Sequence, residues 1–225
     1  MQVAISTCRR HPQYVHGTLE SMYAADPTAN ELTVRLVVCD SDASYVDSWS
    51  GMPQVRVEPL SHREHATIAS LSPHARCTYN FTRLLEGVGD VIALQDDLQF
   101  TENWLRAVTR CIERVERRHG QRFVLALYAS YRFKATPFAP YKKWHFYGNQ
   151  ALYFPDGVRR ELSAYMYDHA EQGGPDDMML KDFLCASDIK LFSMNPNVVQ
   201  HVGGESAIEQ RFHKSPSYKP RGQRC

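Results

Sequence analysis

The feature that most constrains the fold of this chain is a short apolar segment that ends in two adjacent carboxylates. Residues 91–94 are apolar, and Asp96 and Asp97 follow them after one polar residue. Apolar residues then recur at helical spacing from 103 to 119, which predicts an amphipathic surface helix. A buried strand that delivers acids to its C-terminal end suits a hard cation, because carboxylate oxygens are good ligands for Mg²⁺ or Mn²⁺. Adjacent acids are also common in turns and at helix starts, so this stretch alone does not establish a site.

Strand and helix patterns alternate along the rest of the chain. Apolar runs predict further strands at residues 3–5, 32–39, 54–57, 123–128, 150–154, 189–194 and 198–202. Helical spacing predicts further helices at residues 12–24, 78–88, 158–169 and 176–186. We expect a mobile loop or an irregular helix at residues 62–74, and the prolines at 137 and 140 argue against a regular element in 131–147. This alternation predicts an α/β fold with a central, mostly parallel sheet flanked by helices, together with some mixed strands in its later part.

Length and composition bound the number of domains and the compartment. The 225 residues suffice for one large domain, and neither an internal repeat nor an interdomain linker is evident. We therefore predict one domain over residues 1–204 and a basic C-terminal tail over residues 205–225. The net charge of +1 gives no general attraction to nucleic acid, and the six cysteines form no C-x-x-C pair. A long apolar run and a signal-peptide pattern are both absent, which predicts a soluble cytoplasmic protein without a membrane segment.

The order of the early segments resembles the GT-A class of nucleotide-sugar-dependent glycosyltransferases, whose domain is Rossmann-like. Residues 3–10, Val-Ala-Ile-Ser-Thr-Cys-Arg-Arg, are similar to the first strand and nucleotide-facing loop of that class. Residues 36–42 are similar to its second strand, which ends in an acid that contacts the nucleoside. Residues 94–105 are similar to its acid-rich metal motif and the helix that follows. A strict D-x-D is absent because Gln95 stands where the first acid often lies, which makes Asp97 the surer metal ligand.

Two later segments continue the resemblance. Gly-Pro-Asp-Asp at residues 174–177 is similar to the late acid pair at a helix start that supplies the catalytic base in inverting members. Gln-His-Val-Gly at residues 200–203 is similar to the late segment whose histidine reaches the metal or the diphosphate. The sequence of this second segment, with Ser206 after it, resembles the N-acetylglucosaminyltransferase IV family in particular. A lone histidine such as His201 is more often a satisfied core residue, so its assignment depends on the surrounding motifs.

The resemblance implies a hexosyltransferase that moves a sugar from a nucleotide-sugar donor, expected to be a UDP-sugar, to an acceptor hydroxyl with inversion. Asp97 and His201 would hold Mn²⁺ or Mg²⁺. Asp176 suits the N-cap of the last predicted helix, which leaves Asp177 as the base that takes the proton from the acceptor. The residues expected at the nucleotide sugar are Ser6, Thr7, Arg9, Asp40, Asn80, Arg83 and Asp96. The residues expected at the acceptor are Trp144, Tyr147 and Asn149.

The acceptor and two other functions stay open at the level of sequence. Aromatic and basic residues in 131–144 and in the tail suit a nucleic-acid acceptor, such as a modified base in phage-type DNA glycosylation, and equally suit a glycan. Asp-Ser-Asp-Ala-Ser at residues 40–44 resembles the start of haloacid-dehalogenase-type phosphatases, with Asp40 as nucleophile and Asp176 and Asp177 holding Mg²⁺. That motif normally follows the first strand, whereas here a strand–helix unit precedes it. A non-catalytic domain that binds a nucleotide sugar or nucleic acid is the third reading.

Overall fold

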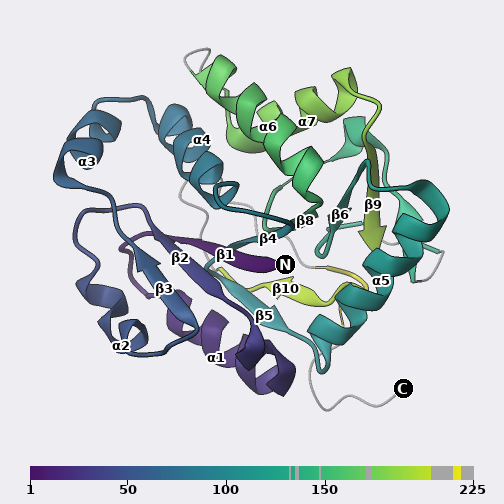
Figure 1. Cartoon of the computed structure of the whole chain (residues 1–225), viewed down its shortest axis with the longest axis horizontal. Helices are drawn as coiled ribbons and strands as arrows, with labels where there is room; N and C mark the ends of the chain where they lie inside the picture. The colour runs from purple at the N-terminus through teal and green to yellow at the C-terminus, as the bar shows by residue number, and fades with distance from the viewer. Residues whose placement is uncertain (132, 135–136, 147, 171–173, 204–214, 219–225) are drawn as a thin grey trace.

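An eight-stranded mixed sheet lies at the centre of the molecule, with helices on both of its faces (Figure 1). The computed structural model describes residues 1–131, 133–134, 137–146, 148–170, 174–203 and 215–218. The strand order is β3-β2-β1-β4-β8-β6-β9-β7, and β5 and β10 form a separate two-stranded sheet. The strands are β1 Gln2–Thr7, β2 Val34–Val38, β3 Val55–Glu58, β4 Val91–Gln95, β5 Leu98–Phe100, β6 Phe123–Ala126, β7 Phe138–Pro140, β8 Ala151–Phe154, β9 Lys190–Met194 and β10 Val199–His201. The helices are α1 Val15–Ala25, α2 Asp47–Ser50, α3 His62–Ala69, α4 Pro73–Leu84, α5 Trp104–His119, α6 Asp156–His169 and α7 Asp176–Ala186, with 3₁₀ turns η1 Pro27–Glu31, η2 Ser44–Val46 and η3 Lys143–His145.

The first half of the sheet is parallel and the second half is mixed. Strands β3, β2, β1 and β4 pair in parallel, as do β6 and β9. Strand β8 runs antiparallel to both β4 and β6, and β7 runs antiparallel to β9. The predicted α/β class with a mostly parallel mixed sheet is confirmed. The C-terminal ends of β1, β2 and β4 therefore meet at one edge, where ligands gather in open parallel sheets.

Alternation along the strands builds a core on each face of the sheet. In β1, Val3 and Ile5 enter the core that holds α1 and α5, while Ala4 between them enters the core that holds α4, α6 and α7. Figure 1 shows α4, α6 and α7 on the upper side of the sheet and α1 on the lower side. Strands buried on both faces read as continuous apolar runs, which is why the sequence marks them clearly.

Asp26 ties the end of α1 to the start of α5. Residue Asn103 at the start of α5 is left-handed, with φ of 55°, and its side chain makes no capping hydrogen bond. The buried Asp26 carboxylate instead accepts from the backbone amides of Leu105 at 3.1 Å and Arg106 at 3.3 Å. A charged acceptor at a helix N-terminus satisfies amides that have no partner within the helix and complements the helix dipole. The helix after the acid turn is thus anchored to the helix before it.

Some segments differ from their sequence-based expectation. In place of an irregular segment at residues 62–74 and a helix at residues 78–88, the chain forms the regular helices α3 His62–Ala69 and α4 Pro73–Leu84. A Ser61–Glu64 capping box starts α3, and Ser72 caps α4 with Pro73 in its first turn. Residues 138–140 form β7 although the last of them is proline. Strand β7 lies at the end of the strand order, where a missing amide donor is tolerated. No helix in the described part of the chain is long and apolar enough to cross a membrane.

Candidate functional site

The acid pair lies in the turn between β4 and β5. Asp96 and Asp97 are almost fully buried, with 4% and 5% of their surface exposed. The Thr7 hydroxyl, at the end of β1, donates to Asp96 Oδ2 at 2.7 Å. The Arg10 guanidinium, from the loop after β1, forms an ion pair with Asp96 Oδ1. Because β1 and β4 are parallel neighbours, the residues that follow them meet at the same edge of the sheet.

Helix α1 fixes the backbone of the acid turn. The buried Thr18 hydroxyl donates to the carbonyl of Asp96 at 2.6 Å and accepts from the amide of Leu98 at 2.9 Å. These bonds hold both ends of the Asp96–Asp97 segment from one side chain. The carboxylates are therefore oriented by the fold before any ligand arrives.

Asp97 and His201 are brought together by the small second sheet. Strands β5 and β10 pair antiparallel, with Leu98 opposite His201, and the amide of Val202 donates to the carbonyl of Asp97 at 2.9 Å. The resulting distance between His201 Nε2 and Asp97 Oδ2 is 3.0 Å. The two residues proposed as metal ligands from sequence are thus direct neighbours.

Gly203 leaves the space that these two side chains need. A Cβ atom at this position would lie 2.4 Å from Asp97 Oδ2 and 3.1 Å from His201 Nε2. Asp97 is buried and hydrogen-bonded to the partly buried His201, so the two side chains cannot yield without breaking their mutual contact. Only glycine is compatible with the observed arrangement of the pair.

Gly203→Ala is expected to weaken Mn²⁺ binding by about tenfold or more while the sheet stays folded, because the added methyl displaces the Asp97 carboxylate. Calorimetric titration of Mn²⁺ measures the change. Gly51→Ala is the matched control, since a Cβ there has no heavy atom within 4 Å. Equal Mn²⁺ affinity in the two variants would contradict the role given to Gly203.

The two carboxylates differ in their ease of protonation. Burial raises the pKa of Asp96 to about 6, although the Arg10 charge and the Thr7 hydrogen bond act in the opposite direction. Burial would also raise the pKa of Asp97, but the hydrogen bond and charge of His201, together with Arg10, outweigh it and hold that pKa below its ordinary value. Asp97 is therefore the more completely ionised carboxylate of the pair near neutral pH.

The donor set fits a divalent cation that shares its ligands with a substrate. Asp97 Oδ1 is buried and has no hydrogen-bond partner among the described residues, so one carboxylate oxygen is available. A carboxylate beside an imidazole suits Mn²⁺. The described residues contain no group of three or more side chains arranged to hold a metal. Mg²⁺ and similar ions commonly take one or two protein carboxylates together with substrate phosphates, and this site matches that pattern.

The second acid pair begins α7 and is connected to β4 by Asn149. The Asn149 amide donates to Asp176 Oδ2 at 2.6 Å, and its carbonyl oxygen accepts from the Gln95 side chain at 3.0 Å. The expected N-cap role of Asp176 is wrong: Pro175, extended at φ −58° and ψ 145°, occupies the cap position, and Asp176 is the first helical residue. Its Oδ1 accepts from the amide of Asp177 at 3.0 Å. Burial raises the pKa of Asp176, and the hydrogen bond from Asn149 opposes that shift.

Asp177 is the less constrained member of this pair. Its side chain is half-buried in the first turn of α7 and has no hydrogen-bond or ion-pair partner within the described ranges. The Thr78 hydroxyl of α4 lies 3.3 Å from the carbonyl of Gly174, so α4 borders the start of α7. A carboxylate in this position can accept a proton from a bound hydroxyl.

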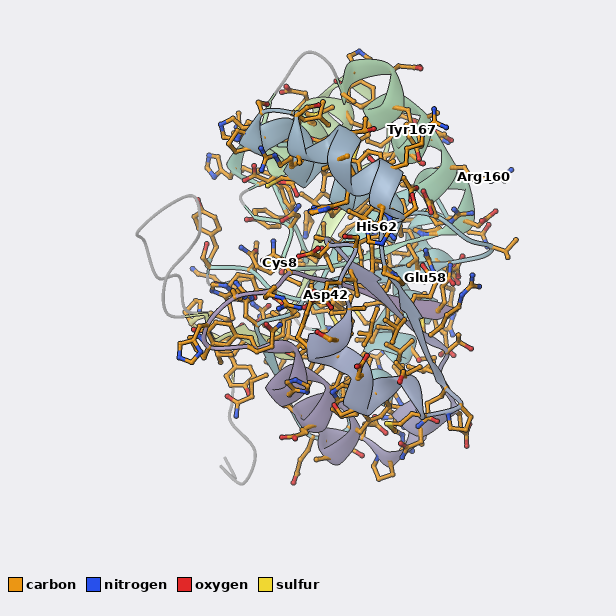
Figure 2. All side chains as sticks on the ribbon, turned by 90° about the vertical axis from the view of Figure 1, so that its left-hand side faces the viewer. Cys8, Asp42, Glu58, His62, Arg160 and Tyr167 are labelled. Atoms are coloured by element: carbon orange, nitrogen blue, oxygen red, sulfur yellow. The ribbon has the colours of Figure 1, made fainter. Side chains whose placement is uncertain are left out.

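The loops after β1 and β2 lie beside each other. Figure 2 looks onto this side of the molecule, with Cys8 and Asp42 close together near its centre. Arg9 bonds to Asp42 and, at 3.0 Å, to the Ser44 hydroxyl, so its charge is directed toward the β2 loop rather than the acid pair. Asp40 Oδ1 accepts from the amide of Asp42 at 3.2 Å and lies 3.7 Å from His65 Nε2.

The remaining residues expected at a ligand are dispersed. The Ser6 hydroxyl lies 3.3 Å from Cys39 Sγ, and Arg83 donates to the carbonyls of Val38 and Glu58, both at 2.8 Å. Asn80 lies on α4, and its buried Oδ1 has no partner in the portion of the chain described.

The acceptor residues expected from sequence also lie apart. Trp144 is 62% exposed on η3, whereas Asn149 is buried in the network of Asp176. Tyr147 falls outside the described residues. Asn149 therefore lies where it can position the second acid pair, and Trp144 lies on the surface.

Sequence reasoning considered Arg10, with Arg9 and Arg83, as an arginine that could reach phosphate, but it did not place Arg10 at the acid pair, and it did not assign Gln95 to the site. Arg9 and Arg10 are adjacent in an irregular loop, where no periodicity indicates which side chain turns inward. Gln95 is the last residue of β4, and its partner Asn149 is 54 positions away in sequence. Such nonlocal hydrogen bonds leave no local pattern.

Comparisons with known proteins give a fold but no family. No protein-family model matches the chain, and no curated protein matches it by sequence. Among solved structures, the galactosyltransferase LgtC, determined with donor and acceptor sugar analogues, matches with a TM-score of 0.51 at 13% identity over 87% of this chain and 73% of LgtC. TarS of S. aureus, in a structure of its residues 1–349, matches with a TM-score of 0.51 at 14% identity, over 87% of this chain and 61% of that one. The glycosyltransferase GlyE of Streptococcus pneumoniae TIGR4 matches with a TM-score of 0.50 at 13% identity, over 86% of this chain and 44% of that one. The chain therefore has the Rossmann-like fold of the GT-A glycosyltransferases.

Proposed function

We propose that the chain is a metal-dependent glycosyltransferase that transfers a sugar from a nucleotide-sugar donor, expected to be a UDP-sugar, to an acceptor hydroxyl. The observation that carries this proposal is the contact of Asp97 with His201 at 3.0 Å, at the edge where β1, β2 and β4 end. Fold alone would not suffice, because one fold can serve many functions. The buried Asp97 carboxylate and the partly buried His201 imidazole, with Gly203 against them, are the groups that support a metal-dependent reaction.

The donor would bind across the loops that follow β1, β2 and β4. Asp97 and His201 would hold Mn²⁺ or Mg²⁺, which would stabilise the negative charge of the departing nucleoside diphosphate. Ser6, Thr7 and Asp40 lie at the ends of the strands that a nucleotide would cross. Asp40 presents carboxylate oxygens that can accept from ribose or base donors.

Asp177 would act as general base on the acceptor. Attack by a hydroxyl on the anomeric carbon releases a proton, and a carboxylate near the attacking oxygen can take it. Direct displacement opposite the diphosphate inverts the anomeric configuration. Asp176 and Asn149 would keep the start of α7 in place against β4. The acceptor is a hydroxyl of a glycan or of a modified nucleic-acid base, and exposed Trp144 offers a ring on which either could stack.

Thermal denaturation with a panel of UDP-, GDP-, CDP- and dTDP-sugars tests this function. With MnCl₂ present, at least one donor should stabilise the protein by mass action, by about 2.7 kcal/mol at a hundredfold excess over its Kd. EDTA should remove that stabilisation. Stabilisation fully retained in EDTA would refute the metal requirement. Release of phosphate from phosphomonoesters that is lost in Asp40→Asn would replace the proposal with a phosphatase.

A further inference from the structure

Arg10 lies where a cation bound to the acid pair would be expected. Its Nη2 atom forms ion pairs with Asp96 Oδ1 and, at 3.2 Å, with Asp97 Oδ2. Asp97 Oδ2 is also the oxygen that contacts His201. One guanidinium group therefore contacts both buried carboxylates and supplies the positive charge that offsets them.

The surroundings of Arg10 hold its side chain in this position without enclosing it. Its guanidinium carbon lies 4.6 Å from the centre of the Tyr14 ring, a cation–π distance. Its backbone amide donates to Gln13 Oε1 at 3.1 Å. The side chain keeps 25% of its surface exposed, and buried Nε has no hydrogen-bond partner among the residues described. Arg10 thus has an open route to solvent and unused donor capacity.

A divalent cation and the Arg10 guanidinium cannot both occupy this position. Both are positive, and an ion held by Asp97 and by His201 Nε2, which faces Asp97 Oδ2 at 3.0 Å, would lie next to the oxygen that Arg10 contacts. If the cation binds Asp97 and His201, like-charge repulsion at contact distance drives the guanidinium away from this carboxylate. The displaced Arg10 guanidinium would lie beside the proposed nucleotide site, and its planar set of N–H donors matches the geometry of phosphate oxygens.

We propose that Arg10 serves as the internal counter-ion of the acid pair. When metal and donor bind, the metal replaces the Arg10 guanidinium at the carboxylates, and the guanidinium pairs with the diphosphate of the donor. This inference rests on the proposed function and adds a coupling to it. The metal alone binds weakly because it must displace Arg10. The nucleoside diphosphate gives the displaced guanidinium a new partner, so metal and nucleotide each strengthen the binding of the other. Neighbouring Arg9 has no such role, because it is paired with Asp42.

Titration of Mn²⁺, followed by the electron paramagnetic resonance signal of the free ion, tests the coupling directly and needs no turnover. Without nucleotide, Arg10→Gln should bind Mn²⁺ about tenfold more tightly than the unmodified protein, because the competing cation is gone. UDP should raise the Mn²⁺ affinity of the unmodified protein by about fivefold or more. In Arg10→Gln this enhancement should be smaller, because only the part that comes from direct contact of the diphosphate with the ion remains.

Two further variants make the test specific. Arg10→Met keeps the aliphatic stem against Tyr14 and adds no oxygen ligand, so it should gain Mn²⁺ affinity as Arg10→Gln does. Arg122→Gln removes an arginine that is paired with Glu161 and Asp188, outside the acid pair, and should behave like the unmodified protein. A gain in Arg10→Gln alone would indicate a new ligand and would overturn the inference. So would unchanged or weaker Mn²⁺ binding in both Arg10 variants.

The outcomes also separate this inference from the proposed function. If the unmodified protein binds Mn²⁺ with a nucleotide sugar and the Arg10 variants show no gain, the function stands and the counter-ion role fails. If the Arg10 variants gain Mn²⁺ affinity but no nucleotide or nucleotide sugar binds, the counter-ion role at the acid pair stands, while the donor function and the transfer of Arg10 to a diphosphate fail. Failure of every form to bind Mn²⁺ overturns both.

Discussion

Asp97→Asn is expected to remove nearly all glycosyl transfer, by about 10³-fold in kcat/KM, while the protein still folds. Asparagine has almost the shape of aspartate, but its amide lacks the negative charge that a divalent cation needs and sets an N–H group against Arg10 or His201. Loss of electrostatic stabilisation of a developing charge typically costs 10² to 10³ in rate, and loss of the ion adds to it. Mn²⁺ titration and donor turnover on the same preparation measure the two effects together.

The matched control for this variant is Asp42→Asn. Asp42 is also paired with an arginine of the loop after β1, but its side chain is 57% exposed and its partner is Arg9. Surface ion pairs contribute little, so this variant should keep its Mn²⁺ affinity and nearly all its turnover. Normal Mn²⁺ binding by Asp97→Asn would exclude Asp97 as a ligand and leave His201 as an ordinary partner of a buried acid.

Asp177→Asn is expected to lower turnover by about 10²-fold or more while donor binding persists, because the variant keeps the shape of the side chain and loses the proton acceptor. The structure supports Asp177 as the base because, within the described residues, its carboxylate has no hydrogen-bond or ion-pair partner and can accept a proton. Single-turnover kinetics with a saturating donor, compared with donor affinity from thermal denaturation, separates chemistry from binding.

Asp176→Asn is the variant to compare with Asp177→Asn. Asp176 accepts hydrogen bonds from Asn149 and from the amide of Asp177, so its replacement should disturb the junction of α7 with β4 and cost about 1 kcal/mol of unfolding free energy. Most turnover should survive. Near-normal turnover in Asp177→Asn with an inactive Asp176→Asn would exchange the two roles, and a product with retained anomeric configuration would remove the need for a base here.

The parts of the fold that the sequence predicts well are those with strong local patterns. Strands β2 and β4 of the central sheet are buried on both faces, so their apolar runs are clear in the sequence, and the long helix α5 has a clear amphipathic period. Strand β5 was not predicted because three residues carry no periodicity and its partner β10 lies about a hundred residues later. The helices at residues 62–84 were partly missed because their caps, rather than an apolar stripe, mark their starts.

The candidate site likewise has some features that the sequence predicts and others that it does not. Asp97 and His201 were paired on the basis of a family resemblance, and the structure brings them into contact, while their role as ligands stays a prediction. The sequence does not show which of the adjacent residues Arg9 and Arg10 contacts the acid pair, because the direction of a side chain in an irregular loop is set by the partners it meets. Those partners, Asp96 and Tyr14, belong to different segments of the chain. The choice between acceptor classes likewise depends on groups that no local pattern identifies.

The pairing of β5 with β10 has a consequence for how the site can fail. His201 reaches Asp97 through a three-residue ladder that is separate from the main sheet. Leu98 and Phe100 of β5 and Val199 of β10 are buried in the same core cluster as α1 and α5, so packing as well as backbone bonding holds the two strands together. The contact of His201 with Asp97 therefore depends on that core. A substitution that loosens the core beneath β5 can separate the two residues although it touches neither of them.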